Sequence, residues 1–290
     1  MPSGKRRGRP FNPNIAPDMF PCTGCSVLNH RDIFGVNPAT NRPRRLCPKC
    51  VEKKEERVKN KITVELGIEP ETFDINKITQ ALKLNNGDKT GTTIGIFGQS
   101  KIAGKTTLLK KIINIAEKDF DFILLFTVNT SASIYEDLRA KKNVRVIYKF
   151  DPTIVNVFHK INGDIDIKNR LNVLFVLDDE IDSKLESTLR NMILTYRNMN
   201  ISTVICSQAY SIVDKKSRGN FNFVFLGAFK TDEHIKDLVH IYLESFAPVE
   251  MPKKHKEVML TKFYREKTKG YNFLVLDNVA EDYKLQIYKA

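Results

Sequence analysis

The sequence predicts an α/β protein in which a mainly parallel sheet is flanked by helices, with a small cysteine-rich module before it. From Thr92 onward, short apolar runs rich in β-branched residues alternate with helix-like stretches, the pattern of strands joined by crossover helices. Such sheets bind ligands beyond the carboxyl ends of their strands. The expected strands are residues 93–97, 122–128, 144–148, 173–177, 203–206, 221–226 and 271–276. The expected helices are residues 105–118, 133–141, 184–198 and 232–244.

Length and charge limit the classes of protein to consider. A chain of 290 residues holds one large core and a small appendage. The net charge is +13, and residues 1–60 hold 13 Lys and Arg against 5 Asp and Glu, which favours a polyanionic partner, nucleic acid before a membrane surface. A basic tail that only aids solubility is the alternative. No apolar run approaches the ~18 residues of a membrane span, and the chain starts with basic and polar residues. We therefore expect an intracellular, soluble protein.

Residues 94–109 read as a strand, a phosphate-binding loop and a helix, which indicates a nucleoside triphosphate site. Gly104 allows close approach of the backbone, Lys105 would reach the β- and γ-phosphates, and the Thr106 hydroxyl would coordinate Mg²⁺. An ordinary glycine turn is the alternative, which the strand and helix context disfavours. The expected contacts with ATP are Gly98, Gln99, Ser100, Lys101, Ile102, Ala103, Gly104, Lys105, Thr106 and Thr107.

The spacing of this loop is unusual. Five residues separate Gly98 from Gly104, where the usual pattern has four. Either the loop is one residue longer, or Gln99 stands at the position of the first glycine.

A second landmark is the apolar strand expected at 173–177, which runs into three consecutive acids, Asp178, Asp179 and Glu180. Carboxylates beside a phosphate loop hold Mg²⁺ and orient or deprotonate the attacking water. The register leaves two pairs open, Asp178 with Asp179 or Asp179 with Glu180, and the first is slightly favoured, with Asp178 as the magnesium ligand. The alternative is that these acids have no catalytic role and only cap the segment that follows them.

Further candidates follow on the next strand and beyond it. Gln208, at the tip of the strand expected at 203–206, is a candidate sensor of the γ-phosphate or the attacking water. Arg197 and Arg218 are candidates for an arginine that crosses a subunit interface, although such arginines are more often ordinary surface residues. Cys206 is most simply a buried strand residue.

Two Cys-x-x-Cys pairs stand before the predicted ATPase, 21 residues apart. This arrangement predicts a structural zinc ribbon or knuckle, since each pair places two thiolates on one tight turn. Two disulfides are the alternative, disfavoured in a reducing compartment. With few apolar residues between the pairs, the metal rather than a core would hold the module folded. The expected zinc ligands are Cys22, Cys25, Cys47 and Cys50.

The basic stretch at residues 5–10 contains Arg-Gly-Arg-Pro at residues 7–10, which resembles the core of a minor-groove AT-hook. A nuclear-import signal or a nonspecific phosphate-binding arm fits nearly as well. The expected organisation is a basic disordered arm (1–20), the zinc module (21–60), a connector with weak helical character near 75–84 (61–89) and a P-loop ATPase domain (90–290).

Residues 96–109, 174–180 and 195–210 together resemble the DNA-packaging ATPases of large eukaryotic DNA viruses, which belong to the FtsK–HerA class of P-loop motors. Residues 216–225 also look like that family's segment after the sensor strand, and the resemblance covers about 90–280. It implies a virus-encoded, homo-oligomeric ring, hexameric or pentameric, that hydrolyses ATP and pumps double-stranded DNA into a capsid, with capsid proteins as possible partners.

The resemblance also implies roles for individual residues: Lys105 and Thr106 for phosphate and Mg²⁺, Asp178 and Asp179 as the acidic pair, and Gln208 as the sensor. The longer loop and the zinc-and-basic N-terminus depart from the usual family core. Other hypotheses are a helicase or transposition-associated ATPase, a nucleotide-switched DNA-binding regulator and, less favoured, a small-molecule kinase.

Overall fold

The computed structural model describes residues 69–83, 90–129, 133–179, 186–214, 216–280 and 284–290, together with four short strands between residues 19 and 43. The chain forms two compact units, Met1–Glu65 and Leu66–Ala290. In the first, β1 (Met19–Pro21) pairs with β2 (Leu28–His30), and β3 (Val36–Asn37) pairs with β4 (Arg42–Pro43), both antiparallel. The predicted basic arm and the four predicted zinc ligands lie outside the described residues.

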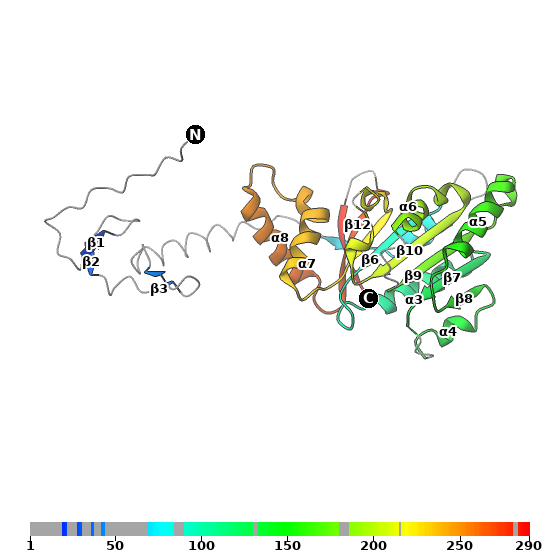
Figure 1. Ribbon diagram of the computed structural model, residues 1–290, viewed down its shortest axis with the longest axis horizontal. Helices are drawn as coiled ribbons and strands as arrows, with labels where there is room; N and C mark the ends of the chain where they lie inside the picture. The colour runs from blue at the N-terminus through cyan, green and yellow to red at the C-terminus, as the bar shows by residue number, and fades with distance from the viewer. Residues whose placement is uncertain are drawn as a thin grey trace, which may run out of the picture. The chain divides into compact units, whose positions relative to one another are not determined.

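The second unit is built on a nine-stranded sheet of order β5-β13-β12-β11-β6-β10-β9-β7-β8 within the described residues (Figure 1). Its strands are β5 (Glu71–Thr72), β6 (Thr93–Phe97), β7 (Phe122–Thr127), β8 (Val144–Ile147), β9 (Val173–Asp178), β10 (Ile201–Ser207), β11 (Phe223–Leu226), β12 (Asn272–Asp277) and β13 (Lys284–Lys289). Its α-helices are α2 (Asn76–Leu82), α3 (Lys105–Ala116), α4 (Glu136–Arg139), α5 (Pro152–Asp164), α6 (Glu186–Leu194), α7 (Asp232–Leu238) and α8 (Lys253–Lys267).

Strand direction confirms the predicted α/β class with a mainly parallel sheet. In the order of the sheet, the neighbouring strands β8, β7, β9, β10, β6 and β11 all pair in parallel. Their carboxyl ends therefore lie at one edge of the sheet. The strand expected at 271–276 is β12, but it runs antiparallel to β11 and to β13. Its first residue therefore lies at the edge where β6 and β11 end, because Leu274 pairs with Leu226.

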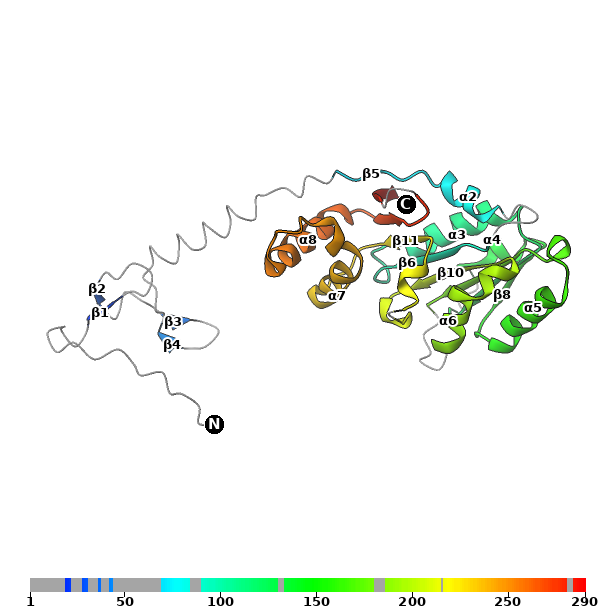
Figure 2. The ribbon, with the colours of Figure 1, turned by 90° about the horizontal axis from the view of Figure 1, so that it is seen from above.

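Two hydrophobic cores cover the two faces of the sheet. Alternate residues of β9 divide between them: Phe175 packs with α5 and α6 on one face, and Val176 packs with α3 on the other. This alternation follows from the two-residue period of a strand. Figure 2 shows α2, α3 and α4 on one side of the sheet and α6 and α7 on the other. The sheet is thus buried on both faces, which leaves its strand ends as the place for a site.

Several elements were not predicted from the sequence. Helix α5 begins at Pro152 after Asp151, whose side chain accepts a hydrogen bond from the N–H of Thr153 at 2.8 Å, and such a cap and proline are a recognisable start signal. Helix α8 and strands β5 and β13 were also missed. The helix expected at 232–244 ends as α7 at Leu238 and continues as a π-helical turn, Val239–Leu243.

The predicted connector contributes to the second unit. Strand β5 pairs with β13, and α2 buries Ile78 and Leu82 in the core beside α3. The second unit accordingly begins at Leu66, inside the segment 61–89. None of the helices in the described part of the chain has the length and apolar character needed to cross a membrane.

Candidate nucleotide-binding site

The loop between β6 and α3 has the backbone of an anion-binding turn. Gly104, the N-cap of α3, has a φ of 72°, a left-handed conformation that glycine adopts without the steric cost of a Cβ. Helix α3 begins at Lys105, and the first N–H groups of a helix have no acceptor within it. These donors and the positive end of the helix dipole form a site for a phosphate group at the carboxyl end of β6.

Gly98 is required by close packing. A Cβ on Gly98 would lie 2.5 Å from the Cβ of Ala103, and a Cβ on Gly227 would lie 2.8 Å from that same atom. The loop therefore folds back on itself and rests against the segment that follows β11. This packing alone explains why residue 98 is a glycine, whether or not the residue contacts a phosphate.

Gln99 fastens the loop to that same segment. Its N–H donates to the carbonyl oxygen of Ala228 at 2.9 Å, and its Oε1 accepts from the N–H of Lys230 at 2.9 Å. The Gln99 side chain thus takes part in holding the loop, a role that a glycine at this position could not fill.

Substitution tests the packing at Gly98. Gly98→Ala is expected to lower the free energy of unfolding by about 1–3 kcal/mol, the usual cost of an inserted methyl group in a packed site. Adding Ala103→Gly removes the atom that the new Cβ meets and should restore most of the loss, less the ~0.5–1 kcal/mol that the extra glycine costs. Denaturant unfolding of the two single variants and the double variant measures this. Purely additive losses would contradict the close approach.

Three predicted residues, which follow the adjacent strands β6, β10 and β9 in the chain, meet at this edge. The Nζ of Lys105, whose side chain is 6% exposed, lies 3.7 Å from Oδ1 of Asp179. Gln208 donates from Nε2 to Oδ2 of Asp179 at 3.2 Å. Asp179 follows β9 and has a φ of 51°, and its N–H donates to the carbonyl oxygen of Cys206 at 2.8 Å. This backbone bond turns the Asp179 side chain toward the phosphate loop.

Asp178 is buried and has a different environment. It is 4% exposed, and its Oδ2 accepts hydrogen bonds from the hydroxyl of Tyr135 and, at 3.2 Å, from that of Thr127. Desolvation raises the pKa of Asp178 above its usual value, the Tyr135 hydrogen bond opposes this shift, and the charge of Asp179 adds to it. The two neighbouring acids are thus held by separate sets of partners.

Sequence reasoning missed Tyr135. This residue precedes α4, is 1% exposed and contacts Asp178 across 43 positions of the chain. Burial, followed by the nearby Asp178 charge, raises the pKa of Tyr135 far above its usual value, so its hydroxyl stays a donor. No local motif marks such a residue.

The family described as poxvirus A32 protein matches residues 83–278. The chain belongs to this family. Membership confirms the predicted relation to viral genome-packaging ATPases, and no match was found among curated proteins.

Solved structures similar to this A32-family chain include two proteins with ATP-γS. The genome-packaging NTPase B204 of Sulfolobus turreted icosahedral virus 2 is 12% identical with a TM-score of 0.48, over 69% of this chain and 98% of that one. The pCW3 conjugation coupling protein TcpA is 13% identical with a TM-score of 0.47, over 79% of this chain and 71% of that one.

Several other predicted residues of the A32-family chain belong to the phosphate loop and the start of α3. Residues 100–104 complete the loop, and Thr106 and Thr107 stand in the first turn of α3. Glu180 lies outside the described residues. Among the described residues, no group of three or more His, Cys, Asp or Glu that could hold a metal ion was found.

Arg197 lies at the amino edge of the sheet, away from the loop. It belongs to the 3₁₀-helix Tyr196–Met199 that precedes β10, and its carbonyl oxygen accepts from the N–H of Gly91, just before β6. The length of β6 alone separates this edge from the phosphate loop by about 13 Å. Arg197 and Lys105 of one chain are therefore not brought together.

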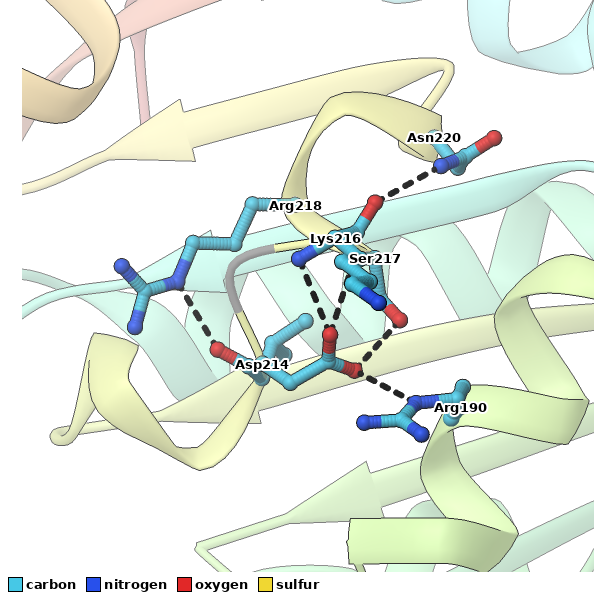
Figure 3. A network of polar contacts seen from close by, with 7 residues as sticks. Arg190, Asp214, Lys216, Ser217, Arg218 and Asn220 are labelled. Carbon is cyan, nitrogen blue, oxygen red and sulfur yellow. Dashed lines mark hydrogen bonds and ion pairs between the residues drawn. The ribbon is translucent and has the colours of Figure 1, made fainter.

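Arg218 lies in the segment that connects β10 to β11 (Figure 3). Its Nε donates to the carbonyl oxygen of Val213 at 2.8 Å, and its guanidinium lies 5.7 Å from the ring centroid of Tyr210. The 3₁₀-helical turn Arg218–Asn220 reaches the amino edge at its last residue, since the Thr93 hydroxyl donates to the carbonyl oxygen of Asn220 at 2.8 Å. Arg218 is thus fixed by the backbone of its own segment.

Asp214 organises this connecting segment, as Figure 3 shows. Its Oδ2 accepts from the Ser217 hydroxyl at 2.6 Å and from Nε of Arg190 in α6 at 3.2 Å. The Ser217 hydrogen bond is the largest cause that lowers the pKa of Asp214 to about 2, and Arg190 adds to it against an opposing desolvation. Because the folded-state pKa is lowered, this stabilisation is present above about pH 4 and is lost as the pH falls toward 2.

Proposed function

We propose that the protein is an ATP-hydrolysing motor that moves double-stranded viral DNA into capsids. The observation that carries this proposal is the contact of Asp179 with both Lys105 and Gln208 at the carboxyl ends of neighbouring strands, in a chain of the poxvirus A32 family. A phosphate-loop lysine, an acid and a polar strand-tip residue at one point are the groups that phosphoryl transfer to water requires.

The residues of the site fit ATP and Mg²⁺. Lys105 and the N–H groups at the start of α3 would bind the β- and γ-phosphates. The Thr106 hydroxyl and the Asp178 carboxylate are hard oxygen donors of the kind Mg²⁺ prefers, and the ion would neutralise charge on the phosphates. The hydrogen bonds that Asp178 accepts from Tyr135 and Thr127 both engage Oδ2.

Asp179 is the group we assign to the attacking water. Its Oδ1 is buried and accepts no hydrogen bond, and its Oδ2 is held by Gln208. A carboxylate in this position orients the water and accepts its proton, while Gln208 senses the γ-phosphate through the same acid. The alternative pair, Asp179 with Glu180, would instead make Asp179 the magnesium ligand.

We infer a homo-oligomeric ring from the place of Arg197. This arginine lies toward the amino edge, whereas the phosphate loop lies at the carboxyl edge. A head-to-tail ring joins two different surfaces of neighbouring copies, so an amino-edge arginine of one copy would approach the ATP of the next. The Nε of Arg197 is buried without a hydrogen-bond partner, whereas Arg218 is held by Val213 and Tyr210. These contacts favour Arg197 for the role.

The N-terminal unit has a separate task in this proposal. Its four cysteines would bind structural zinc, and its basic arm would grip duplex DNA. The protein would be virus-encoded and would act in the infected cell or at assembling virions, with capsid proteins as docking partners.

ATP turnover with and without duplex DNA, together with the mass of the assembled complex, tests the motor. We expect duplex to stimulate hydrolysis and the mass to correspond to a ring. A monomeric enzyme whose turnover ignores DNA would contradict the proposal. Separation of the strands of blunt or tailed duplexes would point instead to a helicase.

A further inference from the structure

Tyr271 is an exposed aromatic residue in a strained turn beside the phosphate loop. The turn joins α8 to β12, and its two consecutive residues Gly270 and Tyr271 have φ values of 66° and 64°. A left-handed conformation is unfavourable for a side chain as bulky as tyrosine. Yet the Tyr271 side chain is 54% exposed, so burial of the ring in the core does not account for the strain. Strain of this kind gathers at functional sites.

The ring lies against the phosphate loop itself. A Cβ built on Gly104 would lie 3.4 Å from both Cβ and Cδ1 of Tyr271, which is ordinary van der Waals contact. Gly104 directly precedes Lys105, so Tyr271 borders the point where α3 begins. The carbonyl oxygen of Tyr271 also accepts from the N–H of Ala290, which ties the turn to the end of β13.

The order of the strands indicates the direction in which a bound nucleotide would extend across the sheet edge. Asp179 and Gln208 follow β9 and β10, which lie on one side of β6, and Tyr271 precedes β12, which lies on the other side beyond β11. Neighbouring strands are about 4.8 Å apart, so β9 and β12 are each roughly 10 Å from β6. A triphosphate whose outer phosphate meets Asp179 and Gln208 therefore extends its nucleoside toward Tyr271.

No other exposed aromatic ring in the described part of the chain has this position. Phe122 starts β7, at the amino edge, and Tyr148 follows β8, the last strand of the sheet, with the Arg139 guanidinium 5.2 Å from its ring centroid. Tyr271 alone among them adjoins the phosphate loop.

We propose that Tyr271 is the platform on which the nucleotide base stacks. This inference rests on the proposed function, because it assigns the base-binding side of the same ATP site. An aromatic ring offers a flat π-face to any base, so such a contact adds affinity with little discrimination between bases. The exposed ring and the fixed turn give the base a preformed surface, and the loop contact sets its distance from the phosphates.

A fluorescence experiment on the full chain tests the platform. The sequence contains no tryptophan, so Tyr271→Trp introduces a single tryptophan, whose emission can be separated from that of the tyrosines, at the proposed contact. We expect ATP to change its emission and inorganic tripolyphosphate, which has no base, to leave it unchanged while still competing with ATP for hydrolysis. The matched control is Tyr148→Trp, an exposed tyrosine at the far end of the same sheet, whose emission should not respond to either compound.

Steady-state kinetics provide the second readout. Tyr271→Ala should raise the KM for ATP by about 5- to 100-fold and leave kcat and the inhibition constant of tripolyphosphate unchanged, whereas Tyr271→Phe should keep the KM of the natural chain. A role limited to supporting the loop would weaken tripolyphosphate binding as well.

The outcomes separate this inference from the proposed function. Equal emission changes with ATP and tripolyphosphate, or none with ATP in a chain that hydrolyses it, would overturn the platform alone. If the natural chain neither binds nor hydrolyses ATP, the proposed function fails and the platform with it.

Discussion

Lys105→Met is expected to lower the kcat for ATP hydrolysis by about 10²- to 10³-fold, the usual effect of removing one preorganised electrostatic group at a reacting phosphate or oxyanion. Methionine keeps the apolar stem that Lys105 buries and removes only its charge, so the fold should persist. Phosphate release at saturating ATP measures the effect, and thermal unfolding confirms that the variant is folded.

Lys110→Met is the matched control for this loss. Lys110 stands on the same helix and also faces an acid, since its Nζ lies 2.8 Å from Asp137. That pair lies at the surface, with Asp137 exposed and Lys110 partly exposed, and surface pairs contribute only about 0–1 kcal/mol to stability. Its turnover should match that of the natural chain. Similar turnover in the two variants would contradict the role of Lys105.

Asp179→Asn and Asp178→Asn should impair ATP hydrolysis in different ways. Asp179→Asn removes the proposed proton acceptor beside Lys105, so we expect kcat to fall by about 10²- to 10³-fold at an unchanged magnesium requirement. Asp178→Asn removes a proposed magnesium ligand, so the concentration of Mg²⁺ that gives half-maximal turnover should rise at least tenfold. Titration of turnover against Mg²⁺ measures both effects.

Asparagine is a conservative replacement at both positions. An asparagine at 178 still accepts hydrogen bonds from Tyr135 and Thr127, so the buried cluster should keep its geometry. If Asp178→Asn left turnover and magnesium dependence unchanged while Asp179→Asn raised the magnesium requirement, the working pair would be Asp179 with Glu180.

The core strands could be predicted to within a residue or two because both faces of the sheet are buried. Strand β6 coincides with its expected range, and β9 extends one residue further. A short, uninterrupted apolar run with β-branched residues is typical of a strand that is buried on both faces. The antiparallel direction of β12 could not be predicted in this way. Direction depends on which strand is the neighbour, and that choice is made by tertiary packing.

Helix α8 shows why some helices cannot be predicted from the periodicity of apolar residues. Its buried residues are two adjacent pairs one turn apart, Met259 with Leu260 and Phe263 with Tyr264, in a stretch otherwise rich in lysine. This narrow stripe, with a polar remainder, gives a weak periodic signal. The stripe nevertheless packs α8 against α7 and β12.

The candidate site also contains some residues that the sequence could predict and others that it could not. Lys105, Asp179 and Gln208 follow apolar strands of one parallel sheet, so their meeting at one edge could be predicted from strand ends alone. Tyr135 reaches the site from the position before a short helix, Tyr271 reaches it from a strained turn, and neither has a neighbouring motif. Their contribution depends on the three-dimensional arrangement and becomes visible only there.

Displacement of a third strand from a DNA triplex tests most directly whether hydrolysis moves the protein along duplex. We predict that the full chain releases a bound third strand with ATP, and that a non-hydrolysable ATP analogue or the Lys105→Met variant does not. Rapid ATP hydrolysis on this DNA with the third strand still in place would contradict the motor.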